Sequence, residues 1–68
     1  PVITIHFKEH KEGSYQVVGF FAKQARGLMS RYAIQNRITD PEQLKVFQED
    51  GYEFADTLSS AQDWVFIR

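Results

Sequence analysis

The sequence predicts an α+β fold that consists of a β-hairpin, a long amphipathic helix, a short helix and two further antiparallel strands. Apolar β-branched and aromatic residues gather near both ends of the chain, which is typical of strands. Apolar residues in the middle recur three and four positions apart, which is typical of a helix. A chain of 68 residues, of which 43% are hydrophobic, is long enough for one small domain. Residues 1–68 are therefore predicted to form a single domain.

The N-terminal part of the chain predicts two strands joined by a turn. Four β-branched or aromatic side chains open the chain: Val2, Ile3, Ile5 and Phe7. They predict a largely buried first strand. Residues 11–14 are polar and include Gly13, which can adopt a positive φ in a turn. Residues 15–20 return to a strand pattern, which completes a predicted hairpin over residues 2–20.

The middle of the chain predicts an amphipathic helix from Phe21 to about Arg37. Its apolar side consists of Phe21, Ala25, Leu28, Met29 and Tyr32, with Ala22 and Ala33 at the edge. A helix with this pattern is expected to pack on a sheet. The opposite side carries Lys23, Arg26, Gly27, Ser30 and Arg37, with Ile34 among them and Arg31 on one flank.

A second, short helix is predicted to follow Asp40. Asp40 can cap this helix, and Pro41 suits the first helical position. Gln43, three residues after the cap, strengthens the prediction. Leu44 and Phe47 are expected to face the core.

The C-terminal third is predicted to add two strands. Gly51 is expected to end the short helix, and residues 52–54 alternate as a strand does. Residues 57–63 are polar and predict a loop, and residues 64–68 form the last predicted strand.

The composition excludes several classes of protein. The aromatic content of 15% is too high for a disordered segment, and charges interrupt the apolar runs too often for a membrane span. Without cysteine, neither a disulfide nor a cysteine-ligated zinc site can form. No signal peptide pattern is visible, so a cytoplasmic location is expected. The chain opens at Pro1 and stops at Arg68 within apolar patterns, so both ends are expected to be cut from a longer protein.

The net charge of −1 hides a strong asymmetry. From Gly13 to Thr39 there is no Asp or Glu, whereas seven acids and two bases follow from Asp40 to Arg68. The acid-free helix therefore offers cationic groups, a hydroxyl and a small residue, which suit phosphate oxygens. The candidate phosphate-binding or nucleic-acid-binding residues are Lys23, Arg26, Gly27, Ser30, Arg31 and Arg37. The plainer interpretation is a solvated helix face.

Gly27 needs its own explanation, because a glycine within a helix costs about 1 kcal/mol relative to alanine. One explanation is a phosphate or base that approaches the backbone there. The other is a segment of a longer parent protein that crosses the helix at this point.

Other chemistry has weak support in the sequence. His6 and His10 raise the question of a metal site, but a strand does not place them on one helical turn and no third ligand is evident. Two exposed histidines in a hairpin are the plainer interpretation, and no metal or other cofactor is expected. The sequence has no cysteine nucleophile, no G-x-S-x-G elbow and no phosphate-cradling glycine loop, which predicts a non-enzymatic protein.

The run FFAKQARGLMSRY at residues 20–32, together with residues 34–39, 41–44 and 51–54, resembles the C-terminal part of the YaaA family of bacterial peroxide-stress resistance proteins. This resemblance implies that the chain is part of a protein several times longer. It also implies a role in keeping the concentration of free intracellular iron low, so that oxidative damage to DNA is limited. A further implication is DNA binding in a positively charged cleft. The residues that carry this implication here are Lys23, Arg26, Gly27, Arg31 and Arg37.

The expected partners are DNA, through the parent protein, and the remainder of the parent chain, with no membrane. Two alternatives stay open. One is an enzyme acting on a nucleotide or nucleic acid, in which this helix clamps phosphate while the missing part supplies the reacting groups. The other is a structural segment that packs on the parent, in which case the isolated segment is expected to associate with itself.

Overall fold

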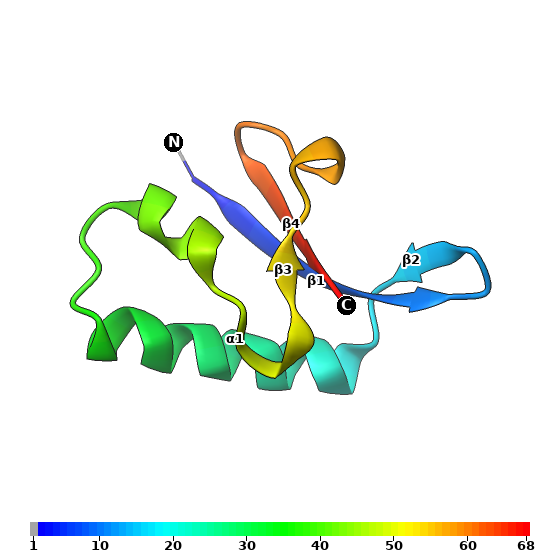
Figure 1. Ribbon diagram of the computed structural model, residues 1–68, viewed down its shortest axis with the longest axis horizontal. Coiled ribbons are helices and arrows are strands. Elements are labelled where there is room, and N and C mark those ends of the chain that lie inside the picture. The colour runs from blue at the N-terminus through cyan, green and yellow to red at the C-terminus, as the bar shows by residue number, and fades with distance from the viewer. Residues whose placement is uncertain (1) are drawn as a thin grey trace.

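The computed structural model describes residues 2–68, which form a four-stranded sheet, one α-helix and three short 3₁₀ helices (Figure 1). In chain order the elements are β1 (Thr4–Lys11), β2 (Ser14–Gln16), α1 (Gly19–Gln35), η1 (Pro41–Val46), η2 (Glu49–Gly51), β3 (Glu53–Phe54), η3 (Asp56–Leu58) and β4 (Asp63–Ile67). The strand order across the sheet is β2-β1-β4-β3. The predicted α+β class is confirmed. No helix formed by residues 2–68 has the length and apolar character that crossing a membrane requires.

The predicted hairpin is confirmed, because β1 and β2 pair antiparallel with Lys11 opposite Ser14. Glu12 and Gly13 form the turn with φ values of 49° and 82°. Two consecutive positive φ values match the twist of the flanking strands in a two-residue hairpin turn. Gly13 adopts this conformation without the steric cost that Glu12 bears.

The second strand is shorter than the predicted range of residues 15–20. All three residues of β2 are exposed, and α1 already begins at Gly19. A strand without a buried face gains little from packing, whereas the early helix start leaves Ala22 only 1% exposed. Ala22 is therefore a core residue and not the edge residue that the sequence predicted.

β1 lies inside the sheet, parallel to β4, with Phe7 opposite Phe66. β4 and β3 pair antiparallel, as predicted for the two final strands. Phe7 is 1% exposed, and Ile3 and Ile5 are partly buried against the core, whereas Val2, which precedes β1, is 80% exposed. The prediction of a largely buried first strand is therefore confirmed only in part.

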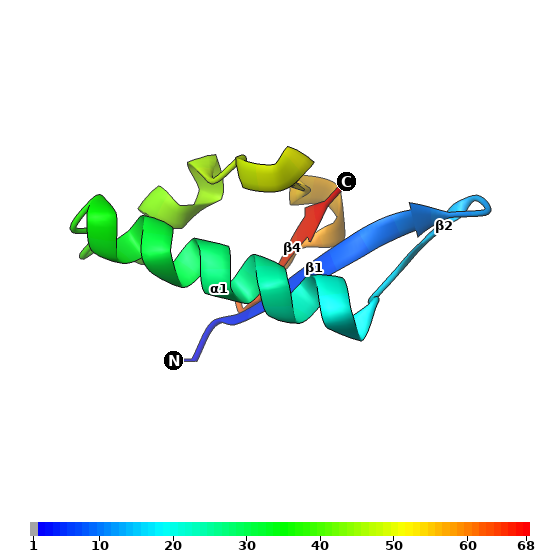
Figure 2. The ribbon, with the colours of Figure 1, turned by 90° about the horizontal axis from the view of Figure 1, so that it is seen from below.

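The core lies between the sheet and a second layer formed by α1 and the η1–η2 segment (Figures 1 and 2). Phe47 is completely buried at its centre. The Phe47 ring meets the rings of Phe7, Tyr32 and Phe66 edge-on, with centroid distances of 6.1, 5.4 and 6.0 Å. Leu44 packs against the same cluster, so both residues face inward as predicted.

The end of α1 differs from the prediction. The main-chain N–H of Arg37 donates to the carbonyl of Ile34 at 3.2 Å, and that of Ile38 donates to Ala33 at 3.0 Å. These two bonds close the helix in a Schellman motif, with Arg37 in the left-handed conformation at φ 51°. The helix therefore ends at Gln35, and the prediction that Arg37 projects from its side is wrong.

The cap of the second helix is as predicted, and a short helix follows it, but this helix is of the 3₁₀ type. The Asp40 carboxylate accepts a hydrogen bond from the Glu42 N–H at 3.0 Å, and Pro41 is the first residue of η1. η1 is a 3₁₀ helix that ends at Val46, because Phe47 has an extended backbone with φ −60° and ψ 125°. The helical prediction fails there because burial of the Phe47 ring outweighs helix continuation.

Candidate nucleic-acid interface

The exposed side of α1 carries five of the six residues predicted to bind phosphate. These residues, the basic face, are Lys23, Arg26, Gly27, Ser30 and Arg31, and all five are exposed. The buried side of the same helix is formed by Ala22, Ala25 and Met29. The helical period thus places the core residues and the basic face on different sides of one helix.

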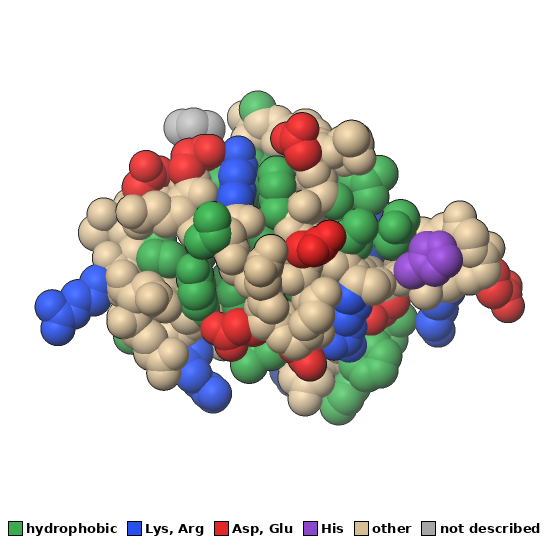
Figure 3. All heavy atoms as spheres, in the orientation of Figure 1, with side chains coloured by type: hydrophobic (Ala, Val, Ile, Leu, Met, Phe, Trp, Pro, Cys, Tyr) green, Lys and Arg blue, Asp and Glu red, His purple; other side chains and the backbone are tan. Residues whose placement is uncertain are grey.

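No carboxylate pairs with the basic face within residues 2–68. The ion pairs there are Lys45–Glu42, Arg68–Glu9, Arg68–Asp50 and His6–Asp63. In Figure 3, Lys and Arg side chains project into solvent near the C-terminal end of α1 and the turn that follows it. Their charge is therefore available to an anion in solution.

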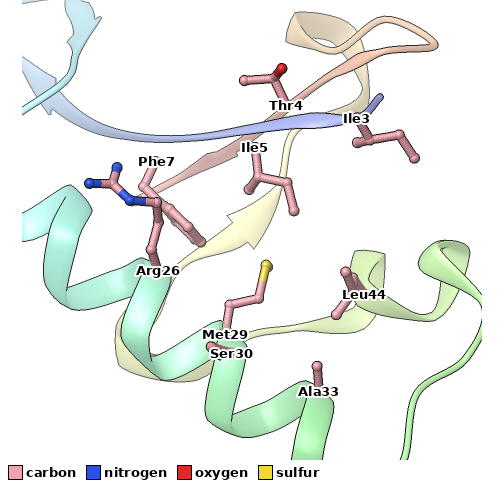
Figure 4. A pocket seen from close by; sticks show the side chains of 9 residues that line it. All are labelled: Ile3, Thr4, Ile5, Phe7, Arg26, Met29, Ser30, Ala33 and Leu44. Carbon is pink, nitrogen blue, oxygen red and sulfur yellow. The ribbon is translucent and has the colours of Figure 1, made fainter. Parts of the chain in front are cut away.

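The basic face borders two separate hollows. Lys23 and Gly27 line a shallow hollow of about 350 Å³ with Phe20 and Gln24. Arg26 and Ser30 line a groove of about 470 Å³ between α1 and the first half of β1 (Figure 4). The structure therefore separates residues that the sequence placed in one contact set.

Arg37 is separated from the basic face, because it follows the end of α1. Its side chain is exposed and has no ion pair within the described chain. From Lys23 to Gln35 the helix is roughly 18 Å long, at a rise of about 1.5 Å per residue, and Arg37 lies beyond that end. Any contact that Arg37 makes with an extended anion is therefore distant from that of Lys23.

Gly27 has open space around it. A Cβ atom built on Gly27 meets no heavy atom within 4 Å apart from its own helix backbone and chain neighbours. No contact within residues 2–68 therefore requires a glycine here. Both explanations offered by the sequence, a bound phosphate and a crossing segment, need a group from outside these residues.

We predict that Gly27→Ala raises the free energy of unfolding of this domain by about 1 kcal/mol, because alanine has the higher helix propensity and meets no neighbour. Urea denaturation measures the change. Gly13→Ala is the matched control, since Gly13 also has open space but has φ +82°, so alanine is expected to destabilise the turn. A loss of stability in Gly27→Ala would contradict the prediction.

Four side chains that the sequence did not bring together join the sheet to η2. The Tyr52 hydroxyl donates to the Glu9 carboxylate, and Arg68 Nε donates to the same carboxylate at 2.6 Å. Arg68 also bonds Asp50 at 2.9 Å. A sequence signal existed, because Glu9 is two residues after the buried Phe7 and shares its face of β1.

The pKa of Tyr52 is raised to about 12, chiefly by burial, and also by the hydrogen bond to Glu9 and the charge of Glu9. Arg68 acts in the opposite direction. The hydrogen bond to Glu9 in turn raises the pKa of Arg68 above its usual range. At neutral pH the cluster therefore holds a neutral phenol and a charged guanidinium around one carboxylate, which stabilises the fold.

We expect the domain to lose stability between pH 10 and pH 12. The unfolded tyrosine loses its proton near pH 10 and the folded one near 12, so the stabilisation is complete below pH 10 and is lost as the pH rises to 12. The loss attributable to Tyr52 is roughly 2 to 3 kcal/mol. Denaturation across this pH range, compared with Tyr52→Phe, isolates the effect because the variant lacks the phenol. Parallel pH profiles for the two proteins would contradict the assignment.

The two histidines contact different residues. His6 Nε2 is 3.0 Å from Asp63 Oδ1, and the His10 ring meets the Tyr15 ring at a centroid distance of 5.2 Å. Within residues 2–68, no three His, Asp or Glu side chains are grouped as a metal ion would require.

Comparison with known proteins places this chain among bacterial proteins called UPF0246. It is 59% identical over all 68 residues to such a protein of Caulobacter vibrioides, 57% identical over 67 residues to one of Acaryochloris marina, and 52% identical over 67 residues to one of Neisseria gonorrhoeae. The chain spans 26% to 27% of the length of these relatives. The model of the family described as peroxide stress protein YaaA matches residues 1–58. The chain belongs to this family, and the resemblance seen in the sequence is confirmed.

Proposed function

We propose that this chain is the C-terminal part of a longer cytoplasmic protein that protects bacterial DNA against peroxide, and that the basic face of α1 contacts DNA phosphates. The family description supports the peroxide-stress role. The limitation of iron-dependent DNA damage, which the resemblance implied, is part of this proposal and belongs to the whole protein.

The observation that carries the DNA contact is an exposed cationic helix side with no internal counter-charge. Lys23, Arg26 and Arg31 have no carboxylate partner within the described chain, whereas Lys45 and Arg68 do. An unpaired cation loses no ion pair when it binds a phosphate, and it releases a counterion from the DNA. Gly27 lets a phosphate approach the backbone beside Lys23, where both residues line the shallow hollow.

The experiment is a salt titration of duplex DNA binding by a full-length family member that carries these 68 residues. Each phosphate contact contributes about 0.9 to the slope of the logarithm of the binding constant against the logarithm of salt concentration. We predict that Lys23→Gln and Arg31→Gln each reduce the magnitude of this slope by about 0.9. Lys23 and Arg31 are chosen because neither lines the groove beside β1.

Lys11→Gln is the matched control. It removes the same charge from an exposed position at the tip of the hairpin, which has no ion pair within the described residues. Its effect on the slope is expected to be negligible. If all three variants keep the parent slope, the basic face does not contact DNA; if all three lower it equally, the effect is one of net charge.

A further inference from the structure

The groove between α1 and the first half of β1 differs in chemistry between its two ends. Its volume of about 470 Å³ lies within the range of small-molecule sites, which is on the order of 300 to 1,000 Å³. In Figure 4 the Arg26 side chain lies at one end of the groove, Ile3 and Leu44 lie at the other end, and Met29 lies between them. A groove of this kind suits a ligand that has one charged end and one apolar end.

The apolar part of the groove leaves hydrocarbon surface exposed to water. Its walls are formed by side chains that are half-buried, namely Ile3, Ile5, Ala33 and Leu44, and Met29 is 6% exposed. Ile5 and Met29 extend toward each other from β1 and α1 (Figure 4). An apolar ligand that covers these side chains removes their surface from water, which favours binding.

Arg26 and Ser30 supply the polar groups of the groove on the α1 side. They are one helical turn apart and exposed, and Arg26 has no ion pair within residues 2–68. The hydroxyl of Thr4, which also lines the groove, points away from it in Figure 4.

The charge of the groove indicates which anion it suits. Arg26 is the one cation among the nine lining residues, and none of the nine is acidic. A guanidinium binds a carboxylate through two parallel N–H bonds, and a serine hydroxyl can donate a further bond. One positive charge matches a singly charged carboxylate, whereas a doubly charged phosphate would need a second cation.

We propose that this groove binds a small aliphatic carboxylate. Arg26 and Ser30 hold the carboxylate, and the hydrocarbon chain extends past Met29 toward Leu44. This binding does not depend on DNA contact by the basic face, because Lys23 and Arg31 test that contact and neither of them lines the groove.

Calorimetric titration of a full-length family member that carries these 68 residues tests the proposal, with octanoate as the probe. Octan-1-ol has the same chain without the charge, and butyrate has the charge with half the chain. Octanoate is expected to bind at least about tenfold more tightly than either. Equal affinity for octanoate and octan-1-ol would overturn the proposal. So would a lack of octanoate binding, which is the result if another part of the longer protein covers the groove.

A first pair of variants tests the polar end. Arg26→Gln is expected to weaken octanoate binding about tenfold and to leave octan-1-ol binding unchanged, which also shows that the variant is folded. Lys23→Gln is the matched control, because it removes the same charge from the same helix but lines the other hollow. Its octanoate affinity is expected to stay within about twofold of the parent value. Equal losses in the two variants would assign the effect to net charge and overturn the proposal.

A second pair of variants tests the apolar end. Ile3→Gln is expected to weaken the binding of octanoate and octan-1-ol alike, by about tenfold, because the chain then meets a polar side chain. Val2→Gln is the matched control, since Val2 is 80% exposed and does not line the groove. Unchanged affinities in Ile3→Gln would place the ligand elsewhere and overturn the proposal.

Discussion

Phe47→Ala is expected to unfold most of this domain. Phe47 is fully buried and its ring meets three other aromatic rings, so truncation removes both apolar burial and edge-on aromatic contacts. Substitutions of this kind cost about 3 to 5 kcal/mol. A domain of 68 residues has a total stability of roughly 3 to 10 kcal/mol, so the loss is comparable with the whole.

Trp64 provides the measurement for this prediction. It is the one tryptophan of the chain and is 2% exposed in β4, so its fluorescence reports unfolding in urea. Phe20→Ala is the control, because Phe20 is 72% exposed and its truncation is expected to change stability by less than about 0.5 kcal/mol. Similar urea midpoints for the two variants would show that Phe47 is not central to the core.

Arg68→Ala is expected to lower the free energy of unfolding by about 3 kcal/mol. The Glu9 side chain is 12% exposed and shares its carboxylate between Tyr52 and Arg68. Removal of Arg68 leaves this carboxylate without its cation in a partly buried position. The same change removes the cation–π contact to Tyr52, where the guanidinium lies 4.5 Å from the ring centroid.

A double-mutant cycle separates these contributions. Glu9→Gln in the Arg68→Ala background removes the unpaired charge, so it is expected to recover about half of the lost stability. In the parent background Glu9→Gln is expected to destabilise the domain instead, because Arg68 then loses its partner. Additive effects of the two substitutions would contradict a coupled cluster.

The local predictions that succeeded depend on backbone chemistry. Gly13 in the hairpin turn and Asp40 with Pro41 at the start of η1 behave as their conformational preferences indicate. The helical period likewise identified Ala25 and Met29 as buried residues of α1. Each of these outcomes depends on interactions within a few residues of chain.

The predictions that failed involve competition between local preference and distant packing. Residues 17–20 have strand propensity, but the helical start that buries Ala22 prevails. Arg37 continues the helical pattern, yet the Schellman bonds end α1 before it. The backbone at Phe47 leaves the helical conformation because its ring fits between α1 and the sheet.

The candidate interface also combines a feature that local sequence patterns predicted with one that depends on tertiary packing. The acid-free run and the helical period were sufficient to predict that Lys23, Arg26 and Arg31 would be exposed on one amphipathic helix. They could not show that Arg26 and Ser30 border a groove with β1 while Lys23 and Gly27 border another hollow. That separation depends on where the sheet lies against the helix.

The sequence by itself determined the fold class, the basic side of α1 and the family, because composition, periodicity and motif are properties of the chain alone. Only the tertiary structure decided the parallel pairing of β1 with β4 and the cluster around Glu9. Each of these joins residues far apart in the chain. Such contacts form when the combined burial of many side chains exceeds the entropy lost on closing long loops, and no local pattern encodes that sum.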